Sequence, residues 1–305
     1  MPKSVGYRDS ARYGTFFIQF GVLTLGIVVI DKIDILMWAK DGEAFLPMVL
    51  GQIRNIVPRE KICHKILVDD HSTDSTVSIA RSFGWEIYPN PEGGIPSGAN
   101  EALSHVDTDF FMTVEQDVVL STNWWLVISK YLEDPNVACA QGIRLDTHPV
   151  LSILDELAYG PPSEKKSLVQ HARAVSMDNN IFRTEIVRSM GGFPRLCPVC
   201  TDTAFRKRIV SETNYQWIID AHVISQHIRN ILKASVEHDY RLNHMCARTT
   251  YCAENKVSTV DVLLRMLLTS PLRGLQIAVR RNYPNIIWDY PLLRLYMLLE
   301  HMRYH

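Results

Sequence analysis

Short apolar segments alternate with amphipathic ones along the first third of the chain. Four largely apolar runs are typical of strands that are covered on both faces: 33–39, 65–68, 85–88 and 109–114. Three segments between them space their apolar residues as one face of a helix does: 45–56, 73–83 and 99–105. This alternation predicts right-handed crossovers and an α/β fold with a largely parallel sheet.

The second half of the chain has a less regular pattern. Strands are predicted at 137–145 and 217–224, and helices at 151–159 and 205–210. The polar segment 163–170 is expected to be a mobile loop.

The C-terminal region from residue 259 has amphipathic helical spacing. Pro271, Pro284 and Pro291 are expected to divide it into short helices. Lysine and arginine outnumber acidic residues by seven to three between 256 and 305. Basic amphipathic helices that carry Trp288, Tyr290 and Tyr296 suit a membrane surface; a cap on the catalytic domain or a dimer contact is the alternative.

An apolar run at 16–30 follows Lys3, Arg8 and Arg12. It is shorter than the roughly 20 residues that a membrane-spanning helix needs, and no small-x-small cleavage site follows it. We expect a strand or helix buried against the domain, with an interfacial membrane segment as the alternative.

Composition narrows the function class. The 305 residues are 47% hydrophobic, which is enough for a full α/β core. A net charge of −1 gives no global positive field, so nucleic acid is not expected as a partner. Six irregularly spaced cysteines suit a reducing cytosol, so a cytoplasmic location is expected, peripheral on the inner face of the membrane if the C-terminal helices bind it.

Polar clusters follow three of the predicted strands, at 40–43, 69–74 and 115–117. Ligands of parallel sheets bind beyond the carboxyl ends of the strands, so these loops are expected to line one cleft. Glu115 and Asp117 stand two residues apart at a strand end, where both side chains would point to one face. The alternative is a pair of solvated acids.

Several segments together resemble the family 2 glycosyltransferases. Val68-Asp-Asp-His-Ser-Thr-Asp-Ser-Thr76 is similar to the family signature Val-Asp-Asp-Gly-Ser-x-Asp-x-Thr. Glu115-Gln-Asp117 stands where the family has Asp-x-Asp. The other similar segments are Trp38-Ala-Lys-Asp-Gly-Glu43, Gly93-Gly-Ile-Pro-Ser-Gly-Ala-Asn100, and Gly191-Gly-Phe193 followed by Thr201-Asp202 and Arg208. The matches follow the family order across roughly residues 32 to 230.

The resemblance implies a GT-A fold, which is a Rossmann-like, mostly parallel sheet flanked by helices. We therefore divide the chain into an N-terminal apolar extension (1–31), a GT-A domain (32–235) and a basic amphipathic helical region (236–305). The chain departs from the family pattern at four positions. Glu115 replaces the first Asp of Asp-x-Asp, Thr201 replaces a Glu, His71 replaces a Gly, and Ala99 stands near where an Arg or Lys is common.

The resemblance also implies roles for individual residues. Mg²⁺ or Mn²⁺ would bind Asp117, with Glu115 and His227 as further ligands. Asp202 would be the general base, and Arg208 would pair with it or with phosphate. The residues expected to bind the nucleotide sugar are Ala39, Asp41, Glu43, Asp69, Asp70, Asn100, Glu115 and Gln116.

Structural roles stay open for some of these residues. Asp70 and Ser72 are candidates for capping the helix 73–83, and Asp202 for capping the helix 205–210. His227 is equally compatible with a structural histidine.

Cys197 and Cys200 form a Cys-x-x-Cys pair that leaves a structural zinc site open, with Cys246, Cys252 and His244 as further ligands. The alternative is two free thiols in a loop near the acceptor.

The predicted activity is inverting, metal-dependent transfer of a sugar from a nucleoside diphosphate sugar. The acceptor would be a hydroxyl or phosphate of a glycan or a lipid-linked molecule such as a polyprenyl phosphate. A catalytically lapsed relative that binds nucleotide or partners is the alternative, because the acids at 115 and 201 are altered. A sugar-phosphate nucleotidyltransferase is less favoured, because no glycine-rich loop with an arginine opens the domain.

Overall fold

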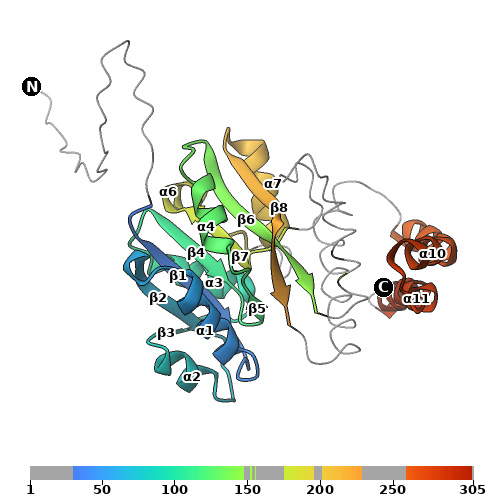
Figure 1. Ribbon diagram of the computed structural model, residues 1–305, viewed down its shortest axis with the longest axis horizontal. Helices are drawn as coiled ribbons and strands as arrows, with labels where there is room; N and C mark the ends of the chain where they lie inside the picture. Colours follow the sequence, from blue (N-terminus) through green and yellow to red (C-terminus); the bar gives the residue numbers. More distant parts are fainter. Residues whose placement is uncertain are drawn as a thin grey trace, which may run out of the picture.

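A mixed eight-stranded sheet forms the centre of the protein in the computed structural model (Figure 1). The structure describes residues 30–147, 152, 155, 175–195, 201–228 and 259–303. The strands, in chain order, are β1 (Ile33–Ala39), β2 (Ile62–Asp69), β3 (Glu86–Pro89), β4 (Phe110–Val114), β5 (Val118–Val119), β6 (Val137–Asp146), β7 (Asn179–Arg183) and β8 (Gln216–His227). The helices are α1 (Leu46–Ile56), α2 (Thr76–Ser82), α3 (Ile95–Ser104), α4 (Trp124–Tyr131), α6 (Thr184–Ser189), α7 (Thr201–Glu212), α10 (Thr259–Arg281) and α11 (Ile286–Arg303), with a short 3₁₀ turn at Arg59–Lys61.

Both faces of the sheet are covered, which explains why β1 is apolar almost throughout. Every residue of β1 is buried, and alternate side chains enter two separate apolar clusters. Ile35 and Met37 pack with α1 and α4, whereas Leu36 and Trp38 pack with α3 on the other face. The sequence prediction of a strand covered on both faces is confirmed.

The strand order is β3-β2-β1-β4-β7-β6-β8-β5. β3, β2, β1 and β4 are parallel to one another, and so are β6 and β8. β7 runs antiparallel to both β4 and β6, and β5 runs antiparallel to β8. The α/β class is confirmed, and the sheet is less parallel than the sequence indicated because β7, which the pattern did not predict, joins the two parallel parts.

The starts of α2, α3 and α7 differ from the sequence prediction by three or four residues; α2 begins at Thr76 and α7 at Thr201. α3 begins at Ile95, four residues before the expected Ala99, because Pro96 fits a first helical turn and Gly94 takes a positive φ of 76° just before it. The expected capping of α2 by Asp70 or Ser72 is wrong. Asp74 Oδ1 instead accepts the N–H of Thr76, at 2.9 Å.

Two long helices, α10 and α11, make up the described C-terminal region. Pro271 lies inside α10 and Pro291 inside α11, so the expected division at these prolines is wrong. A proline removes one backbone hydrogen bond, and the helix-forming leucines and arginines around it maintain the helix. The break falls at 282–285, where Asn282 has a φ of 51° and Pro284 follows.

Among the described residues, no helix combines the length and apolar content needed to cross a membrane. Three segments predicted from the hydrophobic pattern lie outside the described residues: the apolar run 16–30 except Ile30, the helix 151–159 except residues 152 and 155, and the loop 163–170.

Candidate functional site

The turn after β4 and the end of β8 bring together the three residues predicted to hold a metal. Val118 pairs with His227 between β5 and β8, and the N–H of Ile228 donates to the Asp117 carbonyl at 2.8 Å. His227 Nε2 lies 3.1 Å from Asp117 Oδ2. The ligand atoms of Glu115, Asp117 and His227 all lie within 4.8 Å of one another. This spacing suits a single cation bound by two carboxylates and an imidazole.

Arg144, on β6, contacts the other nitrogen of the same histidine, Nδ1. It also forms an ion pair with Asp178, which is fully buried just before β7. A guanidinium only donates hydrogen bonds, so His227 Nδ1 accepts and the ring proton lies on Nε2, toward Asp117. A cation at Nε2 would therefore require that this proton moves to Nδ1 and that Arg144 withdraws from it. The sequence analysis missed both Arg144 and Asp178, because neither stands in a motif and only the pairing of β6 with β7 and β8 brings them to the site.

Asp202 stands in the first turn of α7, with a half-buried side chain. Burial raises the pKa of Asp202 to about 6, and the negative charge of Asp178 adds to the rise, while the Thr203 N–H and Arg144 oppose it. Burial also raises the pKa of Glu115 well above its ordinary value, with further contributions from Asp178 and Asp117. The carboxylates of Glu115, Asp117, Asp178 and Asp202 thus share one neighbourhood with the guanidinium of Arg144, and this excess of negative charge favours a bound cation.

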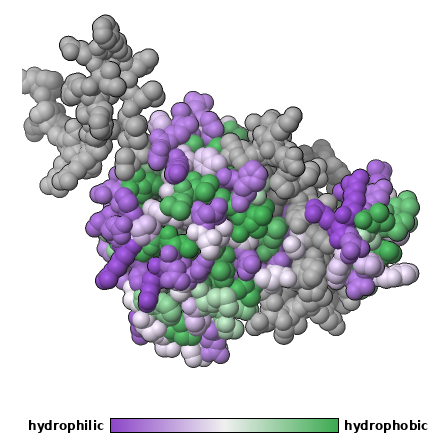
Figure 2. All heavy atoms as spheres, viewed as in Figure 1, coloured by the Kyte–Doolittle hydropathy of each residue, from purple (hydrophilic) through white to green (hydrophobic). Residues whose placement is uncertain are grey.

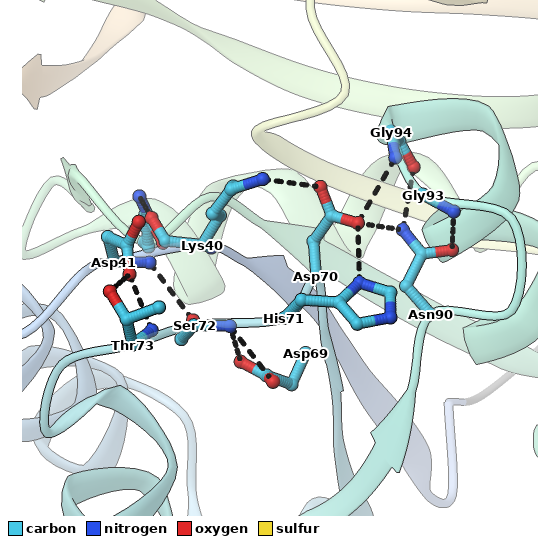
Figure 3. A network of polar contacts seen from close by, with 11 residues as sticks. Lys40, Asp41, Asp69, Asp70, His71, Ser72, Thr73, Asn90, Gly93 and Gly94 are labelled. Carbon is cyan, nitrogen blue, oxygen red and sulfur yellow. Dashed lines mark hydrogen bonds and ion pairs between the residues drawn. The ribbon is translucent and has the colours of Figure 1, made fainter.

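A second group of polar residues lies in the loops after β1 and β2 (Figure 3). Asp41 has a φ of 46°, its N–H donates to Ser72 Oγ at 3.0 Å, and its carboxylate accepts the N–H of Thr73 at 2.8 Å. The N–H of Ser72 donates to the Asp69 carboxylate, at 3.2 Å to Oδ2. These contacts fix the two loops against each other at the carboxyl ends of adjacent parallel strands, where the sequence analysis placed the ligand.

Asp70 connects the same loops to the glycine-rich segment before α3. Its Oδ1 accepts hydrogen bonds from Asn90 Nδ2 at 3.1 Å and from the N–H of Gly94 at 3.2 Å. Lys40 Nζ lies 3.9 Å from Asp70 Oδ2 on the opposite side, as Figure 3 shows. Asp70 therefore organises the loops through contacts within the protein.

The comparisons with known proteins agree with this geometry. The model of a family described as glycosyl transferase family 2 matches residues 34–191, which is more than half of the chain. The chain belongs to glycosyl transferase family 2. It is accordingly an enzyme of the glycosyltransferase class, as the signature at residues 68–76 indicated. A comparison with curated protein sequences gave no match.

Solved structures of glycosyltransferases share the fold. A mannosyltransferase from Pyrobaculum calidifontis, in complex with GDP-Man and Mn²⁺, has a TM-score of 0.57 at 16% identity, over 88% of this chain and 87% of its own. S. aureus TarS in complex with UDP-GlcNAc has a TM-score of 0.54 at 15% identity, over 87% and 90% of the two chains. Glucosyl-3-phosphoglycerate synthase from Mycobacterium tuberculosis, in complex with Mn²⁺, UDP and phosphoglyceric acid, has a TM-score of 0.53 at 13% identity, over 72% and 78%. At these identities the likeness supports the GT-A fold.

Three residues predicted to bind the nucleotide sugar hold this family 2 glycosyltransferase together around the site. The side-chain amide of Gln116 exchanges two hydrogen bonds of 2.9 Å with the backbone of Lys40. Glu43 Oε2 accepts the N–H of Ser75 at 3.0 Å. Ala39 is buried at the end of β1, and its carbonyl accepts the N–H of Asp70 at 2.8 Å. Their positions bring the β1, β2 and β4 loops together.

Asn100 lies on α3 and pairs with the backbone of Phe193. Its Nδ2 donates to the Phe193 carbonyl and its Oδ1 accepts the Phe193 N–H, each at 2.9 Å. Gly192 has a φ of 83°, and a Cβ there would lie 2.3 Å from Asn100 Oδ1. The Gly-Gly-Phe segment is therefore a turn fastened to α3, and the Asn100 amide is engaged there.

Arg208 is directed away from the presumed base. It lies on α7 six residues after Asp202, its Nε is 3.3 Å from Glu212 Oε2, and its Nη2 donates to the Met190 carbonyl at 3.0 Å. The expected pairing of Arg208 with Asp202 is therefore wrong, and its pairing with phosphate stays a prediction. The cation whose charge acts on Asp202 is Arg144.

A second group of potential metal ligands lies at the opposite edge of the sheet, where the parallel strands β1 and β2 begin. A bulge in β2 places Cys63 and His64 against Asp34 of β1, within 4.8 Å of one another. The buried Asp34 carboxylate already accepts hydrogen bonds from His64 and from both Asp107 and Thr108. This group therefore joins β1 and β2 to the turn before β4. The predicted zinc site at Cys197 and Cys200, with Cys246 and Cys252, lies outside the described residues.

Proposed function

We propose that this glycosyltransferase is inverting and metal-dependent, and transfers a sugar from a nucleoside diphosphate sugar to a hydroxyl or phosphate acceptor. The observation that supports it most is the grouping of Glu115, Asp117 and His227 beside Asp202, whose pKa is raised to about 6. The catalytic unit would span residues 32–235 in the cytoplasm, preceded by 1–31 and followed by 236–305.

The residues at the end of β4 and β8 fit a divalent cation. Glu115 and Asp117 would offer oxygen ligands, and His227 would offer Nε2 in the tautomer that carries its proton on Nδ1; these atoms already lie close together. Mg²⁺ or Mn²⁺ bound there would supply positive charge that stabilises the leaving diphosphate. The imidazole favours Mn²⁺ over Mg²⁺, because nitrogen is a softer ligand than carboxylate oxygen.

Asp202 is proposed to accept the acceptor's proton. With a pKa of about 6 it is mostly ionised at neutral pH, yet basic enough to take a proton from a hydroxyl as that oxygen attacks. Attack from the face opposite the diphosphate inverts the anomeric carbon in a single displacement. A phosphate acceptor is already ionised and needs no such base, so the presence of Asp202 favours a hydroxyl.

Asp69 is proposed to contact the base or ribose of the nucleotide. Its carboxylate accepts the Ser72 N–H, and the remaining lone pairs are suited to imide or hydroxyl donors. The loops that Asp41, Asp70 and Gln116 fasten together would form the rest of the nucleotide pocket. A lipid-linked acceptor would agree with the basic C-terminal helices.

The proposal is tested with the full chain, a panel of nucleoside diphosphate sugars and simple hydroxyl acceptors. We expect nucleoside diphosphate release that needs Mn²⁺ or Mg²⁺, stops with EDTA, and is lost in Asp202→Asn. The anomeric coupling constant of the product, measured by NMR, should show the configuration opposite to that of the donor. Turnover that resists EDTA, or a retained configuration, would contradict the proposal. Nucleotide binding without turnover would favour the lapsed relative.

A further inference from the structure

The helices α10 and α11 pack against each other as a hairpin (Figure 1). Ser270, Gly274 and Ala278 of α10 are buried, as are Ile286 and Tyr290 of α11. A Cβ on Gly274 would lie 3.0 Å from the Ile286 carbonyl oxygen, so the two backbones approach closely. This contact fixes which sides of the helices remain exposed.

Each helix of this hairpin carries a row of large apolar side chains that nothing in the described structure covers. The rows follow helical spacing and are Leu264, Leu268, Leu272, Leu275 and Val279 on α10, and Trp288, Leu292, Leu295 and Leu299 on α11. Leu268 and Val279 are 77% exposed and Trp288 is 78% exposed. Figure 2 shows apolar atoms gathered on the outer side of this part of the molecule, with hydrophilic atoms beside them. Exposed apolar rows of this length mark a binding surface.

The charges beside the apolar rows indicate what covers them. At 100° per residue, Arg265, Arg273 and Arg280 fall on the flank of α10 next to the leucine row and away from Gly274. Arg281 adds positive charge, Arg294 packs over the ring of the buried Tyr290, and Asp289 is the acid among the side chains described on α11. A second copy of the chain would bring like charges together along this flank, whereas anionic lipid headgroups would neutralise them.

We propose that the outer face of the α10–α11 hairpin binds an anionic lipid bilayer, with both helices lying in the plane of the headgroups. Neither helix has the length and apolar content to cross a membrane, so the apolar rows would enter only the boundary of the acyl chains. Trp288 is suited to that depth because tryptophan prefers the membrane interface. Binding is independent of the catalytic proposal, whereas the consequence that the acceptor is carried by a lipid rests on the proposed function.

Trp288 allows a direct test, because the other five tryptophans are buried: Trp38, Trp85, Trp124, Trp125 and Trp217. The full chain is mixed with vesicles of phosphatidylcholine alone, or of phosphatidylcholine with phosphatidylglycerol, each containing brominated lipid. We expect quenching of fluorescence with the anionic vesicles, weakened by high salt and abolished in Trp288→Phe. No quenching, or equal quenching by both kinds of vesicle, would overturn the proposal.

Substitutions separate the apolar from the electrostatic contribution. The pair Leu268→Glu and Val279→Glu should lower binding to anionic vesicles at least about tenfold, and so should Arg265→Gln with Arg273→Gln and Arg280→Gln. Leu126→Glu, at a 64% exposed leucine of α4, is the matched control and should bind as the wild type does. Dimerisation in light scattering that the first pair abolishes would assign the face to a second copy instead.

The catalytic proposal is followed separately in the same samples. Metal-dependent release of nucleoside diphosphate with a water-soluble acceptor should be unchanged in the variants that are designed to weaken vesicle binding. Intact vesicle binding by a protein without turnover would leave this inference standing and contradict the proposed function. Full turnover by a protein that does not bind vesicles would support the proposed function and contradict this inference.

Discussion

Two aspartate–histidine pairs lie at opposite edges of the central sheet, one where the parallel strands begin and the other where they end. Each pair has a nitrogen–oxygen distance of 3.1 Å. Asp34 Oδ1 faces His64 Nδ1 at the start of β1 and β2, and Asp117 Oδ2 faces His227 Nε2 at the far end. The Asp34 carboxylate is fully buried, and three backbone N–H groups and a threonine hydroxyl also donate to it. Hydrogen bonds of this number compensate for burying its charge.

The other edge is arranged in the opposite way. Asp117 lies beside Glu115, whose pKa is raised well above its ordinary value by burial and by Asp178 and Asp117. Asp202 shares this neighbourhood and its pKa is also raised. When the pKa of a carboxylate is raised in the folded state, its ionisation lowers the free energy of unfolding as the pH rises toward and through that pKa. The first pair therefore stabilises the fold, whereas the second keeps an electrostatic cost that a bound cation would relieve.

The largest expected effect tests the second pair. Asp117→Asn keeps the size of the side chain but removes the charge, so we expect turnover to fall on the order of a thousandfold. Stability without ligand should be unchanged or slightly higher, because one of the crowded charges is gone. Thermal unfolding and metal-dependent release of nucleoside diphosphate measure the two effects. A variant that loses both activity and stability would place Asp117 in the same class as Asp34.

The next effect tests the first pair. Asp34→Asn replaces an acceptor by an amide whose NH₂ group faces backbone donors, so we expect a loss of about 3 kcal/mol in the free energy of unfolding. Turnover per folded molecule should be unchanged, because Asp34 lies at the edge remote from Asp117. Urea unfolding gives the stability, and Cys63→Ser, at an exposed neighbour in the same bulge, should change it by less than about 0.5 kcal/mol. A stable Asp34→Asn variant would remove the contrast between the two edges.

The sequence predicted the elements whose own residues carry a strong pattern. The apolar run 33–39 predicts β1, because a strand covered on both faces is apolar almost throughout, and the structure confirms both ends. β7 was missed because it begins with Asn179 and Asn180, two polar residues that are fully buried and hydrogen-bonded inside the sheet. Local hydrophobicity does not identify a strand whose polar side chains find partners only in the tertiary structure.

The same limit applies to the site. Glu115, Asp117 and His227 came from motifs and their order along the chain, and the structure brings their ligand atoms together. Arg144 and Asp178 lie in no motif, and they reach the site because β6 pairs with both β7 and β8. Arg208 stands in a motif but is held by Glu212 and Met190. Position in a motif therefore indicated the acids better than it indicated their cationic partner.

The smallest expected effect is that of Arg144 on the pKa of Asp202, and it is measured through the pH dependence of the rate. Asp202 must be ionised to act as the base, and its pKa is about 6. We therefore expect kcat/KM with a hydroxyl acceptor to be level above this pH and to fall about tenfold per unit below it. Arg144 lowers the pKa of Asp202, so Arg144→Gln should raise that pKa and move the fall to higher pH.

Arg144→Gln also removes the contact with His227, so its rate should be lower at every pH, and the position of the acid limb is the informative quantity. Arg195→Gln is a matched control, since Arg195 is an exposed arginine paired with Glu92, and its profile should coincide with that of the wild type. An acid limb that stays in place in Arg144→Gln would mean that Arg144 acts on His227 alone. The electrostatic contrast between the two edges would then reside in the crowded carboxylates and not in the guanidinium among them.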